Sequence, residues 1–494
     1  MLRLPRVRFR VLAAAAGPLA AAAALIPAQG AAAASTATFW VAPAGASGQA
    51  DTSCATAAYS TVQSAVTAAE NSTSLSIPVV NICPGTYSEQ VTILTSVVLT
   101  RAPVAAAQGP VIIQLPASVG ADQSTGLSAT NCQADDASAG VQVPQSVIEV
   151  CAADTGGLNT RGAVVTIRDV TVQGNWPSTV CYDSLYGILV EGGATLRLTG
   201  STVEQAGAYP LNGCQGGVGV EAGFSPTGQI GHAILSNDKI TQYQKNGITV
   251  DGAGSSATIS DVSVTGDGPT SQIAQNGIQF SWGATGSVTH SVVSGNNYTG
   301  TGDASSTGIL AFGGGGSACG IGAGAPLVTD ATFSHNKLTD NDIGVALYNL
   351  DSTCTTSAST PTHVTACYNT ASNSHGYPGG TPSADANISG FGSGVGYQAG
   401  VTDVGNHDVI CYNAISGAGY APLDPTSSLP SPPPPAFVRP VDLVTGPAID
   451  PDAYGNTYDG KAYHPGTTQA GQAGGALARR PAAARHPVVV RPRP

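Results

Sequence analysis

The residues best suited to chemistry in this chain are three carboxylates that follow glycines at a constant spacing. Glu191, Glu221 and Asp251 each stand four residues after a glycine, and these glycines are 30 residues apart. Parallel strands stacked about 4.8 Å apart would place them in one row. The separation of neighbouring carboxylates would match that of a retaining glycosidase pair. The separation of Glu191 and Asp251 would match the wider one of an inverting pair. The row predicts a catalytic site or a Ca²⁺ site, and solvated strand ends are the alternative explanation.

Aromatic residues continue the same position in the later repeats. After Ser281, the equivalent residues are Phe312 and Tyr348, and Trp282 adjoins Ser281. Aromatic rings combine an apolar face with a polar edge. We therefore predict that Trp282, Phe312 and Tyr348 stack on sugar rings of a substrate, with packing under a loop as the alternative for the tryptophan.

Two histidines, His290 and His335, occupy like positions in successive repeats. Zinc requires three or four ligands at fixed geometry. No third candidate is in register with this pair, so we expect no metal site there.

The candidate residues belong to a repeated unit, one glycine followed by alternating apolar residues. The copies begin at Gly187, Gly217, Gly247, Gly277, Gly308 and Gly344. Side chains of a strand alternate between its two faces. The second and fourth residues after each glycine, such as Thr249 and Gln279, should therefore face solvent. The first and third residues after the glycine should point inward, and they include Ile188, Val190, Ile248, Val250, Ile278 and Phe280.

A single unit of this kind cannot bury its own apolar face, whereas stacked units share one continuous core. Only 10% of the residues are charged and 63 are glycine, which favours short strands and tight turns. We predict an all-β fold, a right-handed parallel β-helix. Polar residues that recur at a second turn, including Asn336, Asn369 and Asn413, should hydrogen-bond the backbone of the next coil.

The ends of a solenoid must be covered, because each exposes a core and a strand edge. Ser60 is a suitable N-cap for a short amphipathic helix over residues 60–69, which we expect to close the N-terminal end. The repeat fades after Gly419, and a polyproline run follows. The predicted organisation is a signal peptide at 1–34, the β-helix at 35–422, a Pro-rich linker at 423–440 and an extended or disordered tail at 441–494.

The first 34 residues combine four arginines, an apolar run and small residues, as a secretory signal peptide does. We expect a secreted, extracellular or cell-wall protein without a membrane span. The ten cysteines suit that oxidising destination. Repeat position pairs Cys319 with Cys354 and Cys367 with Cys411. The remaining local pairs are Cys54–Cys83, Cys132–Cys151 and Cys181–Cys214.

The charge distribution restricts the partners. Between the signal segment and the last 16 residues, nine basic residues face 30 acidic ones, a net charge of −21. Nucleic acids and anionic membranes bind through Lys and Arg, so we expect neither as a partner. Polyuronates should be repelled unless a cation mediates. We expect a monomer, with calcium as the one cofactor under consideration.

Two segments resemble the opening of the pectin lyase-like superfamily. Residues 59–66 read Tyr-Ser-Thr-Val-Gln-Ser-Ala-Val, and residues 82–89 read Ile-Cys-Pro-Gly-Thr-Tyr-Ser-Glu. They are similar to a capping helix followed by a Pro-Gly-x-Tyr-x-Glu strand entry, as in pectinesterases. The resemblance covers roughly residues 37–420 and implies the β-helix fold. The catalytic motifs of pectinesterases, polygalacturonases and mannuronan epimerases do not follow, so it implies no particular activity.

The leading functional prediction is a secreted or cell-surface protein that binds extracellular polysaccharide along one face. One alternative is a polysaccharide lyase or glycoside hydrolase that uses Glu191, Glu221 and Asp251. The other is a non-catalytic structural or adhesive solenoid.

Overall fold

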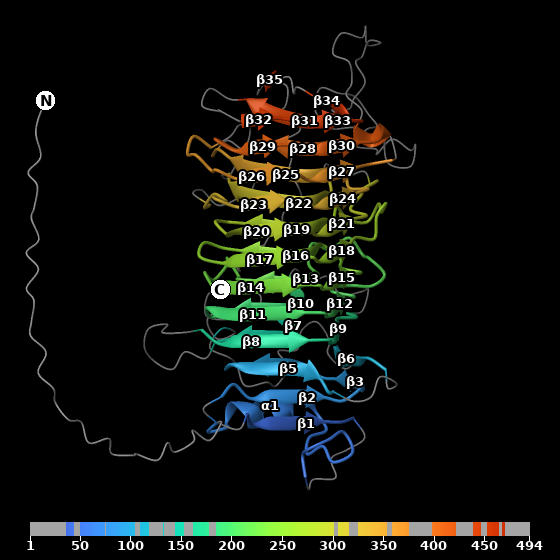
Figure 1. Ribbon diagram of the computed structural model, residues 1–494, viewed down its shortest axis with the longest axis vertical. Helices are drawn as coiled ribbons and strands as arrows, with labels where there is room; N and C mark the ends of the chain where they lie inside the picture. Colours follow the sequence, from blue (N-terminus) through green and yellow to red (C-terminus); the bar gives the residue numbers. More distant parts are fainter. Residues whose placement is uncertain are drawn as a thin grey trace, which may run out of the picture. The chain divides into compact units, whose positions relative to one another are not determined.

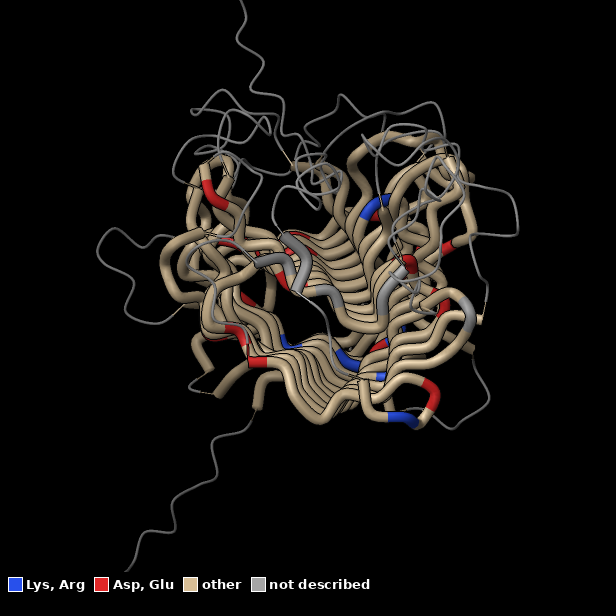
Figure 2. The backbone as a smooth tube through the Cα atoms, turned by 90° about the horizontal axis from the view of Figure 1, so that it is seen from above, with Lys and Arg blue, Asp and Glu red and all other residues tan. Residues whose placement is uncertain are grey.

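The described part of the chain winds into a solenoid of short parallel strands (Figure 1). The computed structural model describes residues 36–43, 50–74, 76–103, 109–117, 132, 144–152, 162–176, 184–300, 305–315, 325–352, 358–374, 398–420, 438–445, 452–463 and 467–469. Seen along its axis, the coils superimpose on one another (Figure 2). Successive coils add strands to three sheets, which we call sheets A, B and C.

The strands of each sheet follow one another in chain order along the axis. Sheet A contains β1 (Thr38–Val41), β2 (Val79–Ile82), β5 (Val97–Arg101), β8 (Val164–Arg168), β11 (Ala194–Thr199), β14 (Gly231–Ser236), β17 (Ser256–Ser260), β20 (Thr285–Thr289), β23 (Thr332–Ser334), β26 (Thr365–Cys367), β29 (Val409–Cys411) and β32 (Asp452–Tyr454). Sheet B contains β3 (Gly85–Ser88), β6 (Val111–Gln114), β9 (Thr171–Gln173), β12 (Thr202–Glu204), β15 (Lys239–Thr241), β18 (Ser263–Thr265), β21 (Val292–Ser294), β24 (Lys337–Thr339), β27 (Thr370–Ser372), β30 (Ala414–Ser416), β33 (Thr457–Tyr458) and β34 (Lys461–Ala462). Sheet C contains β4 (Val91–Ile93), β7 (Gln145–Cys151), β10 (Leu185–Glu191), β13 (Val218–Ala222), β16 (Asn246–Asp251), β19 (Asn276–Ser281), β22 (Thr307–Gly314), β25 (Ile343–Leu350), β28 (Gln398–Asp403), β31 (Val438–Thr445) and β35 (Thr467–Gln469).

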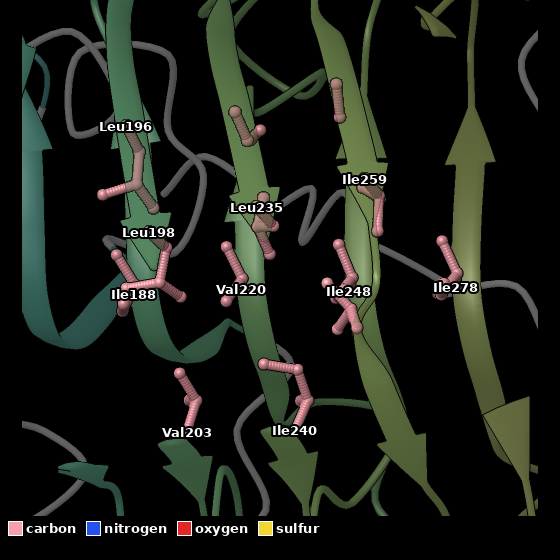
Figure 3. Close-up of a cluster of buried hydrophobic side chains, with 14 of the residues drawn as sticks. Ile188, Leu196, Leu198, Val203, Val220, Leu235, Ile240, Ile248, Ile259 and Ile278 are labelled. Carbon is pink, nitrogen blue, oxygen red and sulfur yellow. The ribbon is translucent and has the colours of Figure 1, made fainter. Parts of the chain in front are cut away.

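The interior is one apolar cluster that runs through the stacked coils. Figure 3 shows Ile188 of sheet C beside Leu198 of sheet A, and Ile248 of sheet C beside Ile259 of sheet A. All six residues expected to point inward are fully buried in this cluster, so the predicted alternation of the inward side is confirmed.

A column of glycines lies where each coil enters sheet C. From Gly187 to Gly308, a Cβ atom on each glycine would lie 2.5–2.7 Å from the carbonyl oxygen of the next glycine in the column. Real Cβ atoms do not come this close, so only glycine fits. The second member is Gly219, because Ile188 pairs with Val220 and Val220 with Ile248. The expected alignment of Gly217 with Gly187 is therefore wrong by two residues.

Asparagines at the turn between sheets A and B form a buried ladder. The side-chain oxygen of Asn369 accepts from the backbone and side-chain nitrogens of Asn336, both at 3.0 Å. Asn413 accepts from Asn369 in the same way, and Asn456 from Asn413. Each of these three donors also reaches a backbone carbonyl of the preceding coil, such as Phe333 O for Asn369. The asparagine turn is thus a structural element, as expected.

The short helix α1 (Val62–Glu70) lies beside β1 and β2 at the N-terminal end (Figure 1). Its N-cap is Thr61, one residue later than expected, and its buried side chains belong to the main core. Glu89 accepts from the backbone nitrogens of Val62 at 2.7 Å and Gln63 at 2.9 Å. Tyr87 donates to the carbonyl of Cys83 at 2.8 Å. The Pro-Gly-x-Tyr-x-Glu segment therefore anchors the capping helix.

The solenoid continues beyond its expected end. β31 pairs in parallel with β28, β32 with β29 and β33 with β30, so part of the predicted 441–494 tail forms a further coil. This coil has Pro440 at the position that glycine occupies in the coils from Gly187 to Gly400, as the carbonyl oxygen of Pro440 facing Gly400 indicates. The glycine spacing could not reveal it. β34 then pairs antiparallel with β33. Residues 1–34, 423–437 and 470–494 lie outside the described residues.

Three of the predicted disulfides lie within the described residues, Cys54–Cys83, Cys132–Cys151 and Cys367–Cys411, and they are confirmed. Cys214 is also disulfide-bonded. Cys181, Cys319 and Cys354 lie outside the described part of the chain. In that part, no helix is long and apolar enough to cross a membrane.

A charge in the core column should unfold the protein. Ile248→Asp would bury a carboxylate among apolar side chains, which costs several kcal/mol. Thr258 of β17 is exposed, so Thr258→Asp is the matched control. We expect a large fall of the melting temperature for the first variant and little change for the second. Equal losses in thermal melts would contradict the register.

Removal of one ladder asparagine should also destabilise the fold. Asn369→Ala leaves two donors of Asn336 and the carbonyl of Phe333 without these partners. We expect a loss of at least about 2 kcal/mol, since each buried polar group left unsatisfied costs about 1–3 kcal/mol. Urea unfolding measures it, and Thr370→Ala, at an exposed neighbour, should change the free energy of unfolding little.

Candidate functional site

The predicted site residues lie on the outward face of sheet C, in two columns rather than one. Asp251 pairs with Ser281, Ser281 with Phe312 and Phe312 with Tyr348, as expected. Glu191 lies in the same column, since Val190 and Val250 align through Ala222. Glu221 pairs instead with Leu189 and Thr249. The expectation of three carboxylates in one row is therefore wrong for Glu221, because the glycine column sets the second coil two residues later.

The carboxylates are buried and are not solvated strand ends. Glu191 is 0% exposed, Glu221 4% and Asp251 2%. Thr249 and Gln279, expected to face solvent, are buried as well. The outward face of sheet C is thus a second buried layer, and its side chains must satisfy their polar groups within the protein.

Glu221 receives a directed chain of hydrogen bonds. The side chain of Asn246 donates to the hydroxyl of Thr249 at 3.0 Å, and the side chain of Thr249 hydrogen-bonds to Glu221. Asn246 also donates to Gln279 Oε1 at 3.2 Å, and Asn276 to the same oxygen at 3.1 Å. These amides fix the hydroxyl proton of Thr249 toward the carboxyl group.

Asp251 receives a similar chain from the other direction. Gln279 Nε2 donates to the hydroxyl of Ser281 at 3.2 Å, and Ser281 donates to Asp251 Oδ1 at 2.8 Å. The backbone nitrogen of Ser225 donates to Asp251 Oδ2, also at 2.8 Å. Gln279 therefore links the surroundings of both carboxyl groups, and each oxygen of Asp251 accepts one hydrogen bond.

Burial and neighbouring charge act together on Glu221. Loss of solvent is the largest cause that raises the pKa of Glu221 well above its usual range, and the charge of Asp251 adds to it. The hydrogen bond from Thr249 opposes both effects. Two nearby acids in different surroundings can divide the roles of proton donor and proton acceptor.

Tyr186 is a residue of this site that was not predicted from the sequence. It is fully buried, and burial followed by the charges of Glu221, Asp251 and Glu191 raises its pKa well above 10. Its register position aligns with Val218 and Asn246. The sequence does contain a pattern that indicates it. Tyr186, Asn246 and Asn276 each directly precede a glycine of the column, so the residue before that glycine belongs to the outward face of sheet C.

The aromatic residues do not form the expected exposed platform. Phe312 and Tyr348 are buried. Trp282 is partly buried, and its ring meets Phe312 edge to face with ring centroids 5.0 Å apart. Of Trp282, Phe312 and Tyr348, only Trp282 is partly exposed.

The described residues contain no group of three or more His, Cys, Asp or Glu side chains placed to hold a metal ion. Glu191, Glu221 and Asp251 therefore do not surround one point as calcium ligands would. His290 and His335 stack on one another with ring centroids 5.2 Å apart, and the stack continues outside the solenoid through Tyr368 and Tyr412.

No protein-family model matches the sequence, and no curated protein matches it. Several solved structures are similar. The Dettilon tailspike protein is 14% identical, with 87% of this chain and 68% of that chain covered and a TM-score of 0.44. A GH136 lacto-N-biosidase from Eubacterium ramulus is 8% identical, with 85% and 67% covered and a TM-score of 0.44. A DFA-IIIase from Arthrobacter chlorophenolicus A6 is 13% identical, with 87% and 86% covered and a TM-score of 0.43.

We draw nothing about activity from these similarities. The chain's own three long sheets of parallel strands make it an all-β protein, the fold class predicted from its repeat.

The raised pKa of Glu221 predicts a pH-dependent stability. A buried acid that holds its proton in the folded state favours folding at low pH. That contribution is lost as the pH rises from the unfolded value, near 4.5, through the folded pKa. Glu221→Gln removes the charge and keeps an oxygen for Thr249. We expect this variant to match the parent near pH 4 and to melt at a higher temperature near pH 8.

The control for this measurement is Glu204→Gln. Glu204 lies in sheet B, is partly exposed and accepts from Gln173 at 3.2 Å. It should leave the pH profile of the melting temperature unchanged. A Glu221→Gln profile parallel to that of the parent would mean that Glu221 is ionised in the folded protein.

Proposed function

We propose that this chain is a secreted β-helix protein that acts on extracellular carbohydrate at the outward face of sheet C. Glu221 is the proton donor and Asp251 the base in hydrolysis of a glycosidic bond. The observation that carries this proposal is the buried pair itself: two carboxyl groups in adjacent strands, one with a raised pKa and the other held by two hydrogen-bond donors.

The register favours one stereochemical course. Glu221 pairs with Thr249, and Asp251 lies two residues further along that strand. A strand spacing of about 4.8 Å and a rise of about 3.3 Å per residue place their Cα atoms about 8 Å apart. Carboxyl groups of inverting glycosidases stand about 6.5–9.5 Å apart, and those of retaining enzymes about 5 Å. The diagonal register holds the two backbones further apart than direct pairing would, so we propose inversion, with water between sugar and base, rather than retention.

Binding without catalysis is the second candidate, and Trp282 favours it. Its partly accessible ring directly follows Ser281, the residue that donates to Asp251. A sugar stacked on this ring would lie beside the carboxyl pair. Since Glu221 and Asp251 are buried, a bound sugar must displace the groups that now cover them. The disulfide bonds support an extracellular destination.

The decisive measurement is product release from a panel of neutral, amino-bearing and uronic polysaccharides. We expect new reducing ends without an unsaturated product. The first product detected by NMR should have the inverted anomeric configuration. Glu221→Gln and Asp251→Asn should each lower the rate by about 10²–10⁴-fold, while Glu204→Gln should retain it.

Other outcomes would replace the proposal. An unsaturated product would make the protein a lyase. Binding that Trp282→Ala weakens, with no product from any polysaccharide, would make it a binding module. Neither binding nor product would indicate a structural solenoid.

A further inference from the structure

An aspartate interrupts the apolar core near the C-terminal end of the solenoid. Asp403 is the last residue of β28, and it pairs with Leu347 of β25 and Leu443 of β31. Earlier coils fill the same inward column with residues such as Val250 and Phe280. Asp403 is 2% exposed. An isolated carboxylate at such a position is strongly unfavourable, so the side chain needs a partner or a proton.

Its partner is a second buried acid. Asp408 lies just before β29 and is 0% exposed. Asp408 Oδ1 accepts from the hydroxyl of Thr362 and the backbone nitrogen of Val364, both at 2.7 Å, and Asp403 Oδ1 accepts from the backbone nitrogen of Gly405 at 2.7 Å. In each acid, Oδ1 therefore accepts hydrogen bonds from neighbouring residues.

The remaining oxygen of each acid is Oδ2. Neither Asp403 Oδ2 nor Asp408 Oδ2 has a donor among the described groups when both acids are ionised, yet the two side chains are close enough to hydrogen-bond. Two carboxylates are both acceptors. The contact therefore requires a proton on one of them.

No Lys or Arg among the described residues acts on this pair. The charged groups around it are His363, whose charge acts on Asp408, and His407, whose ring lies edge to face against His363 at 5.8 Å. Both imidazoles are exposed. Asp452 donates its backbone nitrogen to the carbonyl of Asp408, and Asp330 donates its own to the carbonyl of Thr362. On the β25 and β31 sides the neighbours in the column are leucines.

We propose that Asp403 and Asp408 form a proton-dependent latch, in which one shared proton holds the turn between β28 and β29 and its loss opens the C-terminal coils. The shared proton bridges the two Oδ2 atoms. When it leaves for solvent, two negative charges face one another inside the core, and the turn must open to let water reach them.

The direction of the pH effect follows from burial. Loss of solvent, and then the charge of Asp408, raise the pKa of Asp403 well above its usual range; burial raises that of Asp408 to about 6. A raised pKa means that the latch is fully closed at acidic pH. Opening should become at least about tenfold more favourable for each pH unit above roughly pH 4, until the pKa values of the folded pair are passed.

Hydrogen exchange of the full chain tests this, measured by mass spectrometry from about pH 4 to about pH 9 and corrected for intrinsic rates. We expect the protection of β28, β29, β31 and β32 to fall with pH in the parent. β16, which pairs with the strand of Glu221, and β19 beyond it should respond to pH in the same way in the parent and in the Asp403 variants. Asp403→Asn supplies a permanent donor toward Asp408 and should make the protection of those four strands independent of pH. Asp403→Leu, which matches Leu347 and Leu443, removes one of the two acids but leaves Asp408 buried. It should weaken the pH dependence without abolishing it, and it serves as the second variant if the asparagine variant folds poorly.

The matched control is Asp452→Asn, at an exposed acid of the neighbouring coil, which should keep the pH dependence of the parent. The latch is refuted if the protection of the four strands does not change with pH in the parent, or if both Asp403 variants lose protection as the parent does. No glycan enters the measurement, so its outcome is independent of the proposed carbohydrate site.

Discussion

The whole structure depends on one constraint, the close approach of backbone to backbone where each coil enters sheet C. Glycine removes the side chain that would strike the next carbonyl oxygen, and the coils can then stack at the spacing of a parallel sheet. From β10 to β28, this contact sets the register of the strands in sheet C. It therefore decides that Glu221 lies diagonal to Asp251, and that both receive hydrogen bonds from the coils beyond them.

Much of the fold could be predicted from the sequence because its physical cause recurs. The inward column from Ile188 to Phe280, the capping helix and the asparagine turn each follow from a local pattern that repeats. The second coil was misaligned because Gly217 and Gly219 both suit the pattern, and only the packing of the column distinguishes them. The last coil was missed because Pro440 replaces the glycine.

The site was predicted less well, since burial of the outward face has no periodic signal. A strand that alternates apolar and polar residues indicates one buried face, and here both faces of sheet C are buried. Thr249 and Gln279 look like surface residues in the sequence, yet they orient the carboxyl groups. Phe312 and Tyr348 were assigned to a sugar platform for the same reason, and they are covered.

The antiparallel pairing of β34 with β33 affects whether one solenoid can add strands of another molecule at its end. A parallel stack with identical asparagines in register resembles the core of a fibril, in which any exposed end can recruit another strand. β34 turns back at the last strand of sheet B and occupies hydrogen-bonding groups that a further coil would use. At that edge the chain therefore blocks the addition of a further strand, which protects the solenoid against end-to-end growth.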